Sequence, residues 1–423
     1  MSQEKKYRAV KGMADIFPEG AARWRALEDR AVSAALRYGY GEIRTPLVEP
    51  TELFVRSIGE TTDIVEKEMF TFAGSGGKSF SLRPEGTAGV VRACLEHGVF
   101  GQNPLVRCFY LGPMFRRERP QAGRRRQFHQ FGAEAIGSRR PALDVELIDL
   151  LLLFLEEAGL EGWSLAVNSV GCPRCRPGYR EQLGVYLERV EDRLCENCRR
   201  RRETNPLRTL DCKNPSCREL AGEGPKPVDS LCPDCSSHLA SAERLLSGIG
   251  LPYTIDPMMV RGLDYYTSLV FEVTGPALGA QDAVAGGGRY DNLVGELGGP
   301  DLGAAGFSVG LERILIGLAE KEIPPAAAPL GRLYLAAAGP EAFEPQFILL
   351  SKLRRRGFWA VTDYGERSLK AQLREANKLG AGRVLIRGPE ELAAGTVKIK
   401  DMESGKETSV PENEAISSLV RCN

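Results

Sequence analysis

The sequence predicts an α+β protein that carries a cysteine-rich insertion and ends in a small α/β unit. Three observations lead to this prediction. Residues 105–135 form two strand-like segments around an arginine-rich turn, which is the pattern of a β-hairpin. Eight of the 11 cysteines lie within residues 172–235. After residue 330, strand-like and helix-like segments alternate, which favours a small parallel or mixed sheet.

Size and composition exclude several classes of protein. The chain has 423 residues, 43% of them apolar, which is enough for a large core and two or three domains. Its formal net charge is zero, so a nucleic acid would have to be held by local basic patches. Residues 1–12 lack the apolar core of a signal peptide, and the apolar run near 150–155 is too short to span a bilayer. We therefore expect a soluble cytoplasmic protein with no membrane partner.

The first hundred residues contain clear helix and strand signals. Apolar residues recur at helical spacing after residue 20, and Gly39 suits the end of that helix. Pro46 and Pro50 mark the following strand as an edge. Glycines at 74, 76 and 77 predict a hairpin turn. In order, we expect a helix over 20–39, a strand over 40–50, a helix and a strand within 51–72, a strand over 79–83 and a helix over 88–96.

A charge, a glycine and a hydroxyl meet where that last strand becomes a helix, in Arg83-Pro84-Glu85-Gly86-Thr87. A carboxylate at this place could simply help to start the helix, because the helix dipole favours negative charge there. That role does not account for all three groups together. Glu85 and Thr87 are therefore candidate site residues.

The hairpin within 105–135 concentrates arginines at its turn. Arg116, Arg117 and Arg119 leave the first arm, and residues 124–126, all arginine, enter the second. This arrangement puts guanidinium groups where a polyphosphate could lie, and each charge-assisted hydrogen bond is worth about 1.5–3 kcal/mol. The alternative is a basic hairpin that only faces water. Beyond it, residues 141–160 predict a helix with a buried apolar stripe, and 163–171 predict a strand.

The cysteines between 172 and 235 form four short-spaced pairs. Each spacing lets two thiolates reach one tetrahedral ion, with sulfur about 2.3 Å from zinc. Two four-cysteine sites, one site with leftover thiols, and an iron–sulfur cluster are all compatible with this pattern, and the spacing favours zinc. The sequence does not reveal how the pairs combine. The candidate ligands are Cys172, Cys175, Cys195, Cys198, Cys212, Cys217, Cys232 and Cys235.

The chain after the insertion returns to strands that carry polar motifs. The stretch RGLDYY at 261–266 lies between two predicted strands, and three glycines at 286–288 bring backbone close to another group. A strand over 304–310 runs into a helix with Arg313 in its first turn, where the dipole opposes a positive charge. Residues 322–330 predict a linker. Beyond it we expect strands over 331–339, 358–365 and 383–388, helices over 343–357 and 368–380, and an edge strand over 396–401.

In order and detail, these motifs resemble the class II aminoacyl-tRNA synthetases, and most closely the histidyl-tRNA synthetase family. The helix and strand that end at Pro46 resemble the first class motif, the hairpin 107–134 the second, and GLER at 310–313 the third. RGLDYY at 261–266, AGGGRYD at 285–291 and LRPEGT at 82–87 resemble stretches of the histidine-specific family.

The resemblance covers nearly the whole chain and implies a fold. It implies an antiparallel sheet with flanking helices, a Cys-rich insertion domain that leans on the tRNA acceptor stem, and a C-terminal α/β anticodon-binding domain. The first motif implies a homodimer. The implied domains are 1–171 and 246–325 for the two catalytic parts, 172–245 for the insertion, and 330–423 for the anticodon-binding domain.

The resemblance also implies an activity. ATP would activate L-histidine to histidyl-adenylate with release of pyrophosphate, and histidine would then pass to the 3′ end of tRNA(His). The attacking carboxylate is already ionised at neutral pH, so the reaction needs placement and charge neutralisation rather than a general base. The three histidines of the chain therefore need no catalytic role. Relatives that lack the cysteines imply that zinc would be structural.

Site residues follow from the matching motifs. The implied catalytic residues are Arg116, Arg261 and Arg313. The implied histidine-binding residues are Glu85, Thr87, Gln130, Glu134, Tyr265, Tyr266 and Tyr290. ATP, with Mg2+ on its β- and γ-phosphates, would meet Arg116, Glu118, Phe128 and Arg313. The tRNA would meet Gln121, Arg124 and Arg126.

Two other classes of protein remain as alternatives. The first is the non-catalytic regulatory subunit of ATP phosphoribosyltransferase, which shares the core but lacks the C-terminal unit and several motif residues. The presence of Arg116, Arg261, Arg313 and residues 330–423 favours the enzyme. The second is a threonyl- or prolyl-type synthetase, against which RGLDYY argues.

Overall fold

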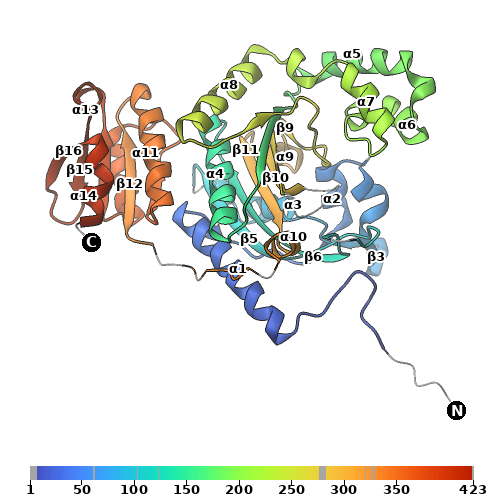
Figure 1. Cartoon of the computed structure of the whole chain (residues 1–423), viewed down its shortest axis with the longest axis horizontal. Helices are drawn as coiled ribbons and strands as arrows, with labels where there is room; N and C mark the ends of the chain where they lie inside the picture. Colours follow the sequence, from blue (N-terminus) through green and yellow to red (C-terminus); the bar gives the residue numbers. More distant parts are fainter. Residues whose placement is uncertain are drawn as a thin grey trace.

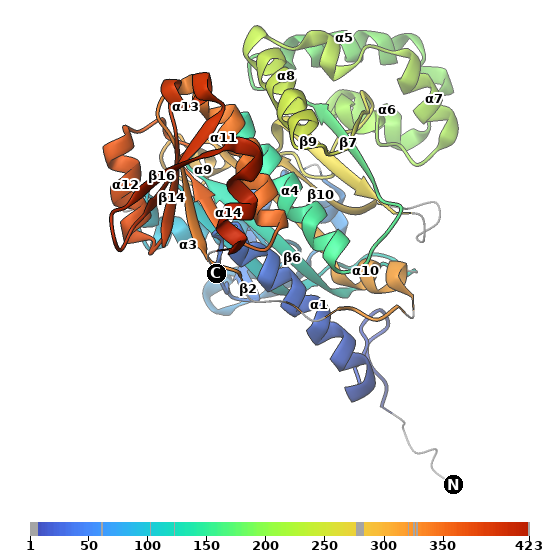
Figure 2. The ribbon, with the colours of Figure 1, turned by 60° about the vertical axis from the view of Figure 1, so that its left-hand side comes forward.

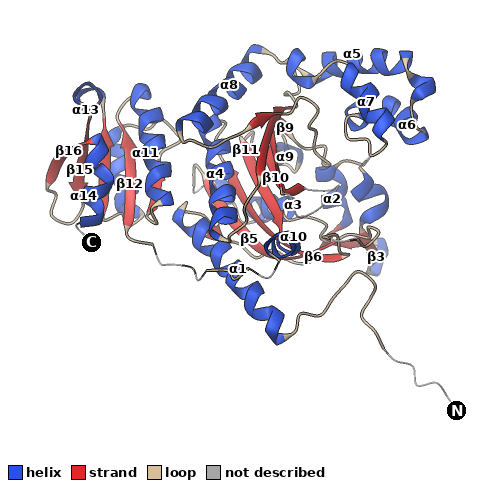
Figure 3. Ribbon diagram, viewed as in Figure 1, coloured by secondary structure: helices blue, strands red, loops and turns tan. Residues whose placement is uncertain are grey.

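The structure, a computed structural model, describes residues 7–421 except 61, 102, 122, 276–282, 320, 325, 327 and 328. Figure 1 shows a central domain around a large sheet, a helical insert beside it and a small C-terminal domain on the other side. In Figure 3, helices lie against the large sheet and against the sheet of the C-terminal domain, as expected for an α+β fold. No helix in the described ranges is long and apolar enough to cross a membrane.

The central sheet has eight strands in the order β1-β5-β6-β11-β10-β9-β7-β8. Its six inner strands pair antiparallel, and the short edge strands β1 and β8 pair parallel with their neighbours. This confirms the antiparallel sheet and the hairpin over 105–135. The strands are β1 (Gly41–Glu42), β5 (Val106–Phe115), β6 (Gln127–Ile136), β11 (Ala304–Gly310), β10 (Ala283–Arg289), β9 (Thr267–Thr274), β7 (Ser164–Ser169) and β8 (Thr254–Ile255).

One face of this sheet is covered by three helices, α1 (Pro18–Arg37), α4 (Pro141–Glu157) and α8 (Pro233–Gly248). Phe131 of β6 lies at the centre of this layer, with its ring 5.2 Å from Phe154 of α4 and 5.5 Å from Phe307 of β11. Since side chains alternate along a strand, the even-numbered residues of β6 face the other way. That second face carries the polar motifs.

Two shorter helices, α3 (Thr87–Glu96) and α9 (Leu293–Glu296), pack on the second face, and α2 (Thr51–Ile58) packs against both of them. The strand predicted over 40–50 is wrong as a single element. It is divided into β1, in the large sheet, and β2 (Val48–Pro50), which joins β4 (Ser79–Leu82) and β3 (Phe70–Ala73) in a separate sheet. Pro46 offers no N–H between them, so pairing is interrupted at that point. The predicted glycine turn joins β3 to β4.

The insert consists of helices. The sequence predicted no helix or strand for this segment. Helices α5 (Arg176–Arg189), α6 (Glu196–Thr204) and α7 (Pro215–Glu223) enclose a small core of Leu183, Leu187 and Leu220 together with buried cysteines. Helix α8 then leads back to the central sheet and packs on α4. The predicted boundary between 245 and 246 falls inside α8.

The C-terminal domain has the predicted alternation of strands and helices around a sheet ordered β13-β12-β14-β15-β16. The expectation that 396–401 forms an edge strand is wrong, because β16 pairs along its outer side. The predicted linker lies partly outside the described residues. The elements are β12 (Arg332–Ala337), α11 (Phe343–Arg355), β13 (Trp359–Thr362), α12 (Leu369–Lys378), β14 (Arg383–Arg387), α13 (Pro389–Ala394), β15 (Thr396–Asp401), β16 (Glu407–Pro411) and α14 (Ala415–Arg421).

A buried carboxylate joins this domain to the central one. Figure 2 shows the C-terminal domain beside α4, which carries the fully buried Glu146. Its oxygens accept hydrogen bonds from Arg354 at 2.8 Å and Tyr364 at 2.7 Å, both from the C-terminal domain. Arg107 of β5 donates from the other side at 3.2 Å. These partners hold the pKa of Glu146 below its usual value even though burial alone would raise it.

Candidate active site

Glycines form the floor of the candidate site on the second face of the sheet. In the antiparallel register, Glu134 of β6 lies opposite Gly306 of β11, and Gln130 lies opposite Gly310. A Cβ atom on Gly306 would lie only 1.8 Å from Oε2 of Glu134. The glycines therefore leave room for long polar side chains to lie flat over the strands.

Glu134 is the central group of this face. It is 1% exposed, and its carboxylate accepts hydrogen bonds from Thr87 Oγ1 at 2.7 Å and from the Tyr290 hydroxyl. Burial raises the pKa of Glu134 to about 8, because desolvation of the carboxylate outweighs the bonds from Tyr290 and Thr87. Among the described residues, no arginine, lysine or histidine forms an ion pair with it. The site thus holds a buried carboxylate with hydrogen-bond donors but without a cation.

Three tyrosines predicted from the motifs meet beside Glu134. The Tyr265 ring lies 4.7 Å from Tyr266 and 5.6 Å from Tyr290 between centroids, so the three rings form one aromatic wall. A fourth tyrosine, Tyr110, was missed. Its hydroxyl lies 3.4 Å from Glu134 Oε1. We call Thr87, Glu134 and these four tyrosines the carboxylate–tyrosine cluster.

Glu85 has a structural task at this place as well. Its carboxylate accepts from the backbone N–H of Thr87 at 2.6 Å and of Ala88 at 3.0 Å, which satisfies free donors at the start of α3. The alternative from the sequence, that Glu85 starts the helix, is therefore confirmed. Burial raises the pKa of Glu85, and the nearby Arg116 is among the groups that oppose this shift.

Gln130 carries an unsatisfied acceptor on the same β6 face as Glu134. Its Nε2 donates weakly to Ser308 Oγ at 3.4 Å, while its Oε1 is buried and has no partner among the described residues. A buried acceptor without a donor is uncommon in proteins unless a ligand supplies the donor. Gln130 therefore has the chemistry of a substrate-binding residue.

Arg116 follows β5 directly in the hairpin and contacts the strand–helix junction that carries Glu85 and Thr87. Its Nε donates to the carbonyl of Pro84 at 2.9 Å, and its guanidinium carbon lies 5.2 Å from the centre of the Phe128 ring. The predicted stacking surface is therefore in contact with a cation. Phe128 shares the β6 face with Gln130 and Glu134, as the alternation requires.

Arg261 lies over β10 at the opposite side of the cluster. It forms an ion pair with Glu272 of β9, and its side chain is 20% exposed. The backbone of Gly286 runs directly below its guanidinium group. The Nε of Arg261 is buried without a hydrogen-bond partner in the part of the chain that the structure describes. Arg261 therefore keeps donor capacity for a ligand.

The hairpin loop forms a second group. Arg313, in the first turn of α10 (Leu311–Leu318), donates to the carbonyls of Gly123, at 3.2 Å, and Ala283. Glu118 accepts from Arg124 Nη1 at 3.1 Å, and its carbonyl accepts from Arg126 Nε at 3.3 Å. We call this set, with Gln121, whose backbone pairs with that of Arg124, the loop group. The described contacts do not join Glu118, Arg124 or Arg126 to the carboxylate–tyrosine cluster.

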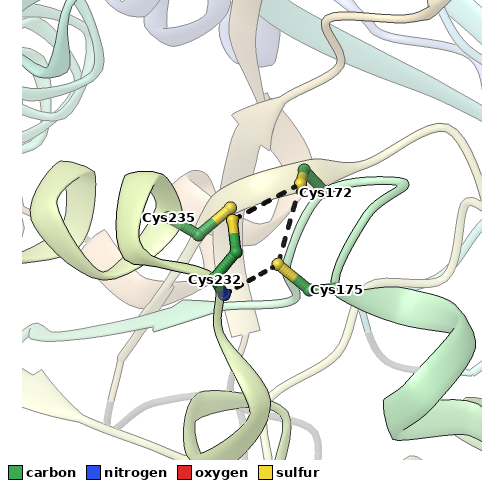
Figure 4. Close-up of side chains that lie close together, drawn as sticks. All are labelled: Cys172, Cys175, Cys232 and Cys235. Carbon is green, nitrogen blue, oxygen red and sulfur yellow. Dashed lines mark hydrogen bonds between the residues drawn. The ribbon is translucent and has the colours of Figure 1, made fainter.

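The eight cysteines gather into two sets of four. The first consists of Cys172, Cys175, Cys232 and Cys235, and the second of Cys195, Cys198, Cys212 and Cys217. The outer two sequence pairs thus combine, and so do the inner two, which answers the question the sequence left open. In the first set, which Figure 4 shows, Cys172 Sγ lies 3.6 Å from Cys175 Sγ and 3.9 Å from Cys232 Sγ.

These distances can be compared with a zinc site. Zinc–sulfur bonds of about 2.3 Å in a tetrahedron place the sulfur atoms about 3.8 Å apart. The Sγ atoms of Cys195 and Cys212 in the second set are separated by 3.9 Å. In each set, a backbone N–H also donates to a sulfur, from Cys232 to Cys175 at 3.1 Å and from Cys195 to Cys217 at 3.2 Å. Both sets therefore fit a tetrahedral thiophilic ion.

The chain is similar to known proteins over nearly its whole length. Residues 12–175 and 229–314 match the family described as Histidyl-tRNA synthetase, and residues 340–421 match the Anticodon binding domain. Proteins named Histidine–tRNA ligase from Natranaerobius thermophilus and Desulforudis audaxviator are 50% identical over 405 residues and 49% over 411. The alignments cover 96% of both chains in the first case, and 97% of this chain and 98% of the relative in the second. The crystal structure of apo S. aureus histidyl-tRNA synthetase superposes with a TM-score of 0.62 at 33% identity, covering 98% of this chain and 100% of that one.

Proposed function

Because the chain belongs to the histidyl-tRNA synthetase family, we propose that the carboxylate–tyrosine cluster binds the histidine that this enzyme attaches to tRNA. The chain is a class II aminoacyl-tRNA ligase, and its family uses ATP with Mg2+. One observation carries the assignment of the substrate site. Glu134 is a buried carboxylate that accepts from Thr87 and Tyr290 and has no ion pair with a described cation. The α-ammonium or the imidazole N–H of histidine would supply the missing donor.

Further groups would give the site its selectivity. Gln130 Oε1 has no donor among the described residues, and the rings of Tyr265 and Tyr266, tilted by 50° to one another, offer aromatic surface against which an imidazole could pack. A site that depends on such hydrogen bonds rejects an amino acid lacking them by about 10⁴-fold or more. Glu85 keeps Thr87 in place by holding the start of α3, and it would face the substrate with its remaining lone pairs.

The first reaction joins the histidine carboxylate to the α-phosphorus of ATP. A carboxylate oxygen forms the new P–O bond, the bond to the β-phosphate oxygen breaks, and pyrophosphate leaves with its electron pair. The nucleophile is already ionised, so catalysis consists of alignment and neutralisation of negative charge. Arg116 and Arg261 would act on the α-phosphate and the reacting carboxylate. The Nε of Arg261, which has no hydrogen-bond partner among the described residues, supports this role.

The loop group, together with Arg116 and Phe128, would receive the rest of the nucleotide. Arg313 would meet the γ-phosphate end, and Phe128 with Arg116 would offer stacking and charge to the adenine and α-phosphate. Glu118 would contact the adenine side. In the second step, a ribose hydroxyl of the terminal tRNA adenosine attacks the histidyl carbonyl and AMP leaves. Gln121, Arg124 and Arg126 would contact the acceptor end in this step.

Both cysteine sets would hold a structural zinc ion. The sulfur separations of 3.6–3.9 Å support this proposal, as do the backbone N–H bonds to sulfur. Zinc in such closed four-thiolate sites contributes folding energy and has no open position for chemistry. It would keep the insert compact, because that part of the chain has only a small apolar core of its own.

The remaining assignments rest on the family alone. We propose tRNA(His) as the nucleic-acid partner, a homodimer as the assembly and the cytoplasm as the location. The regulatory-subunit alternative is less supported, because the relatives named Histidine–tRNA ligase match over nearly the whole chain. The match of residues 340–421 to an anticodon-binding domain also argues against it.

Pyrophosphate exchange with each of the twenty amino acids tests the proposed substrate site. Purified protein should incorporate labelled pyrophosphate into ATP only when histidine is present. Glu134→Ala should weaken histidine binding more than ATP binding. Equal loss of both affinities would show general damage and would contradict the assignment of Glu134.

A further inference from the structure

The segment that carries Arg261, Tyr265 and Tyr266 lies in a loop between β8 and β9. A loop does not by itself fix a guanidinium group or two rings in place, and catalysis by alignment demands that they be fixed. The insert contacts this segment along its length. Met258 and Val260, just before it, pack against the insert core.

The first strong contact comes from Arg208, which lies between α6 and α7 in the insert. Its Nη1 donates to the carbonyl of Arg261 at 3.0 Å, and its Nη2 donates to the carbonyl of Gly262 at 2.6 Å. Its side chain is only 11% exposed. One guanidinium group thus fixes two successive peptide groups at the residue whose side chain lies beside the cluster.

The second contact comes from Arg176, the first residue of α5. Its Nη2 donates to the carbonyl of Tyr266, and its Nε lies 3.4 Å from the carbonyl of Val170. The adjoining backbone is also paired: Val170 N–H donates to Ser268 O at 2.8 Å, and Ser268 N–H donates to Gly171 O at 2.9 Å. Ser268 has a left-handed φ of +51°, so tertiary contacts must hold its conformation.

Each of these arginines is tied to one cysteine set. Arg176 follows Cys175 directly, and its N–H donates to the carbonyl of Cys172 at 3.0 Å. Arg208 precedes Cys212 by one turn, and Cys212 N–H donates to the carbonyl of Thr209 at 3.2 Å. The first set lies at the base of the insert, and three cysteines of the second set belong to its core.

We propose that the insert braces the segment 261–266 from within the same chain, with Arg208 and Arg176 as its two positioning residues. This inference rests on the proposed histidine site. Arg208 sets the backbone from which the Arg261 side chain reaches the reacting atoms, so its loss lowers kcat. Arg176 sets the backbone of Tyr266, so its loss raises the KM for histidine.

The test is histidine-dependent pyrophosphate exchange with the full-length chain carrying Arg208→Ala, Arg176→Ala or Arg180→Ala. Arg180 is the matched control, because its Nη2 also donates to a backbone carbonyl, that of Thr204 within the insert, at 3.0 Å. We expect Arg208→Ala to lower kcat about tenfold or more, and Arg176→Ala to raise the histidine KM about tenfold. The KM for ATP should stay within about twofold in both, and Arg180→Ala should match the unsubstituted chain.

The outcomes separate this inference from the function on which it rests. If the unsubstituted chain and Arg180→Ala show no histidine-dependent exchange, the proposed function fails. If both exchange normally and the other two variants behave like Arg180→Ala, the brace is refuted. If the alanine variants also lose ATP binding, the same assay is repeated with Arg208→Lys and Arg176→Lys. A lysine can still donate to one of the carbonyls, so these variants distinguish a lost brace from general damage. Partial recovery in the lysine variants supports the brace, and no recovery overturns it.

Discussion

Gly286 lies directly beneath Arg261: a Cβ atom on this glycine would be 2.2 Å from Nη2 of the arginine. The φ angle of Gly286 is not in the left-handed range, so the glycine is needed for space and not for backbone conformation. The guanidinium group can lie flat on β10 only because this position has no side chain. The three-glycine motif is thereby linked to the placement of Arg261, which we propose as a catalytic residue.

Gly286→Ala should displace Arg261 without disturbing the fold. We expect the kcat of pyrophosphate exchange to fall about tenfold or more, because a misplacement of 1 Å can cost about a hundredfold. ATP binding should persist. Gly295→Ala is the control, since a Cβ at that position meets nothing within 4 Å. Unchanged kinetics in Gly286→Ala would show that Arg261 has another position in the working enzyme.

The pKa of Glu134, raised by burial to about 8, predicts a specific pH dependence of stability. Between about pH 4.3 and 8, the unfolded chain has an ionised Glu134 while the folded protein keeps the proton. The free energy of unfolding therefore decreases with rising pH in this window, by up to about 1.4 kcal/mol per unit, and levels off above pH 8. Glutamine does not titrate. The free energy of unfolding of Glu134→Gln, minus that of the unsubstituted chain, should therefore increase from pH 5 to pH 8.

Thermal unfolding of both proteins without substrate, at pH 5, 6.5, 8 and 9, measures this difference. The offset between the two curves also contains altered hydrogen bonds to Thr87 and Tyr290, so only its change with pH is informative. A difference that stays constant across the series would mean that Glu134 is ionised throughout.

Metal analysis of the purified protein should find about two zinc ions per chain. Cys175→Ser should remove one of them and Cys198→Ser the other, because the two residues belong to different sets. Cys94→Ser should keep both, since Cys94 is a buried free cysteine outside the sets. Absence of metal together with fully titratable thiols would refute both sites.

Glu146→Ala should destabilise the contact between the central and C-terminal domains. The substitution leaves Arg354, which is 1% exposed, without its carboxylate, and such a loss costs about 3–5 kcal/mol. Glu156→Ala is the control. It removes a more exposed carboxylate that pairs with Arg355, and it should lower the free energy of unfolding by about 1 kcal/mol or less. Denaturant unfolding followed by tryptophan fluorescence compares the two variants. Equal losses would show that the buried network does not stabilise the protein.

The sequence predicted elements whose signals are local. The hairpin predicted over 105–135 is formed by β5 and β6, and its outer ends lie one residue from the predicted bounds, because aromatic and β-branched residues flank an arginine-rich turn that contains Pro120 and Gly123. The start of α10 at the GLER motif was also predicted, because a strand there runs directly into a helical segment. Those two elements together carry Arg116, Phe128, Gln130, Glu134 and Arg313.

Features that depend on tertiary contacts were not predictable in this way. The combination of cysteine pairs is set by how α5 to α8 fold back on one another, and spacing along the chain does not encode it. Tyr110 looked like an ordinary strand tyrosine. Its place is revealed only by its register opposite Gly132, two residues before Glu134 on β6, and by the space that this glycine leaves for its ring. Strand β16 was hidden because its residues are mostly polar and exposed.

Arg261→Ala tests the account of the active site most directly. Its ATP affinity and histidine-dependent pyrophosphate exchange should be measured on the same preparation. We expect ATP binding close to that of the unsubstituted protein and exchange reduced by orders of magnitude, since Arg261 would act on charge that develops at the reacting carboxylate and phosphate. Near-normal exchange in Arg261→Ala would contradict the account.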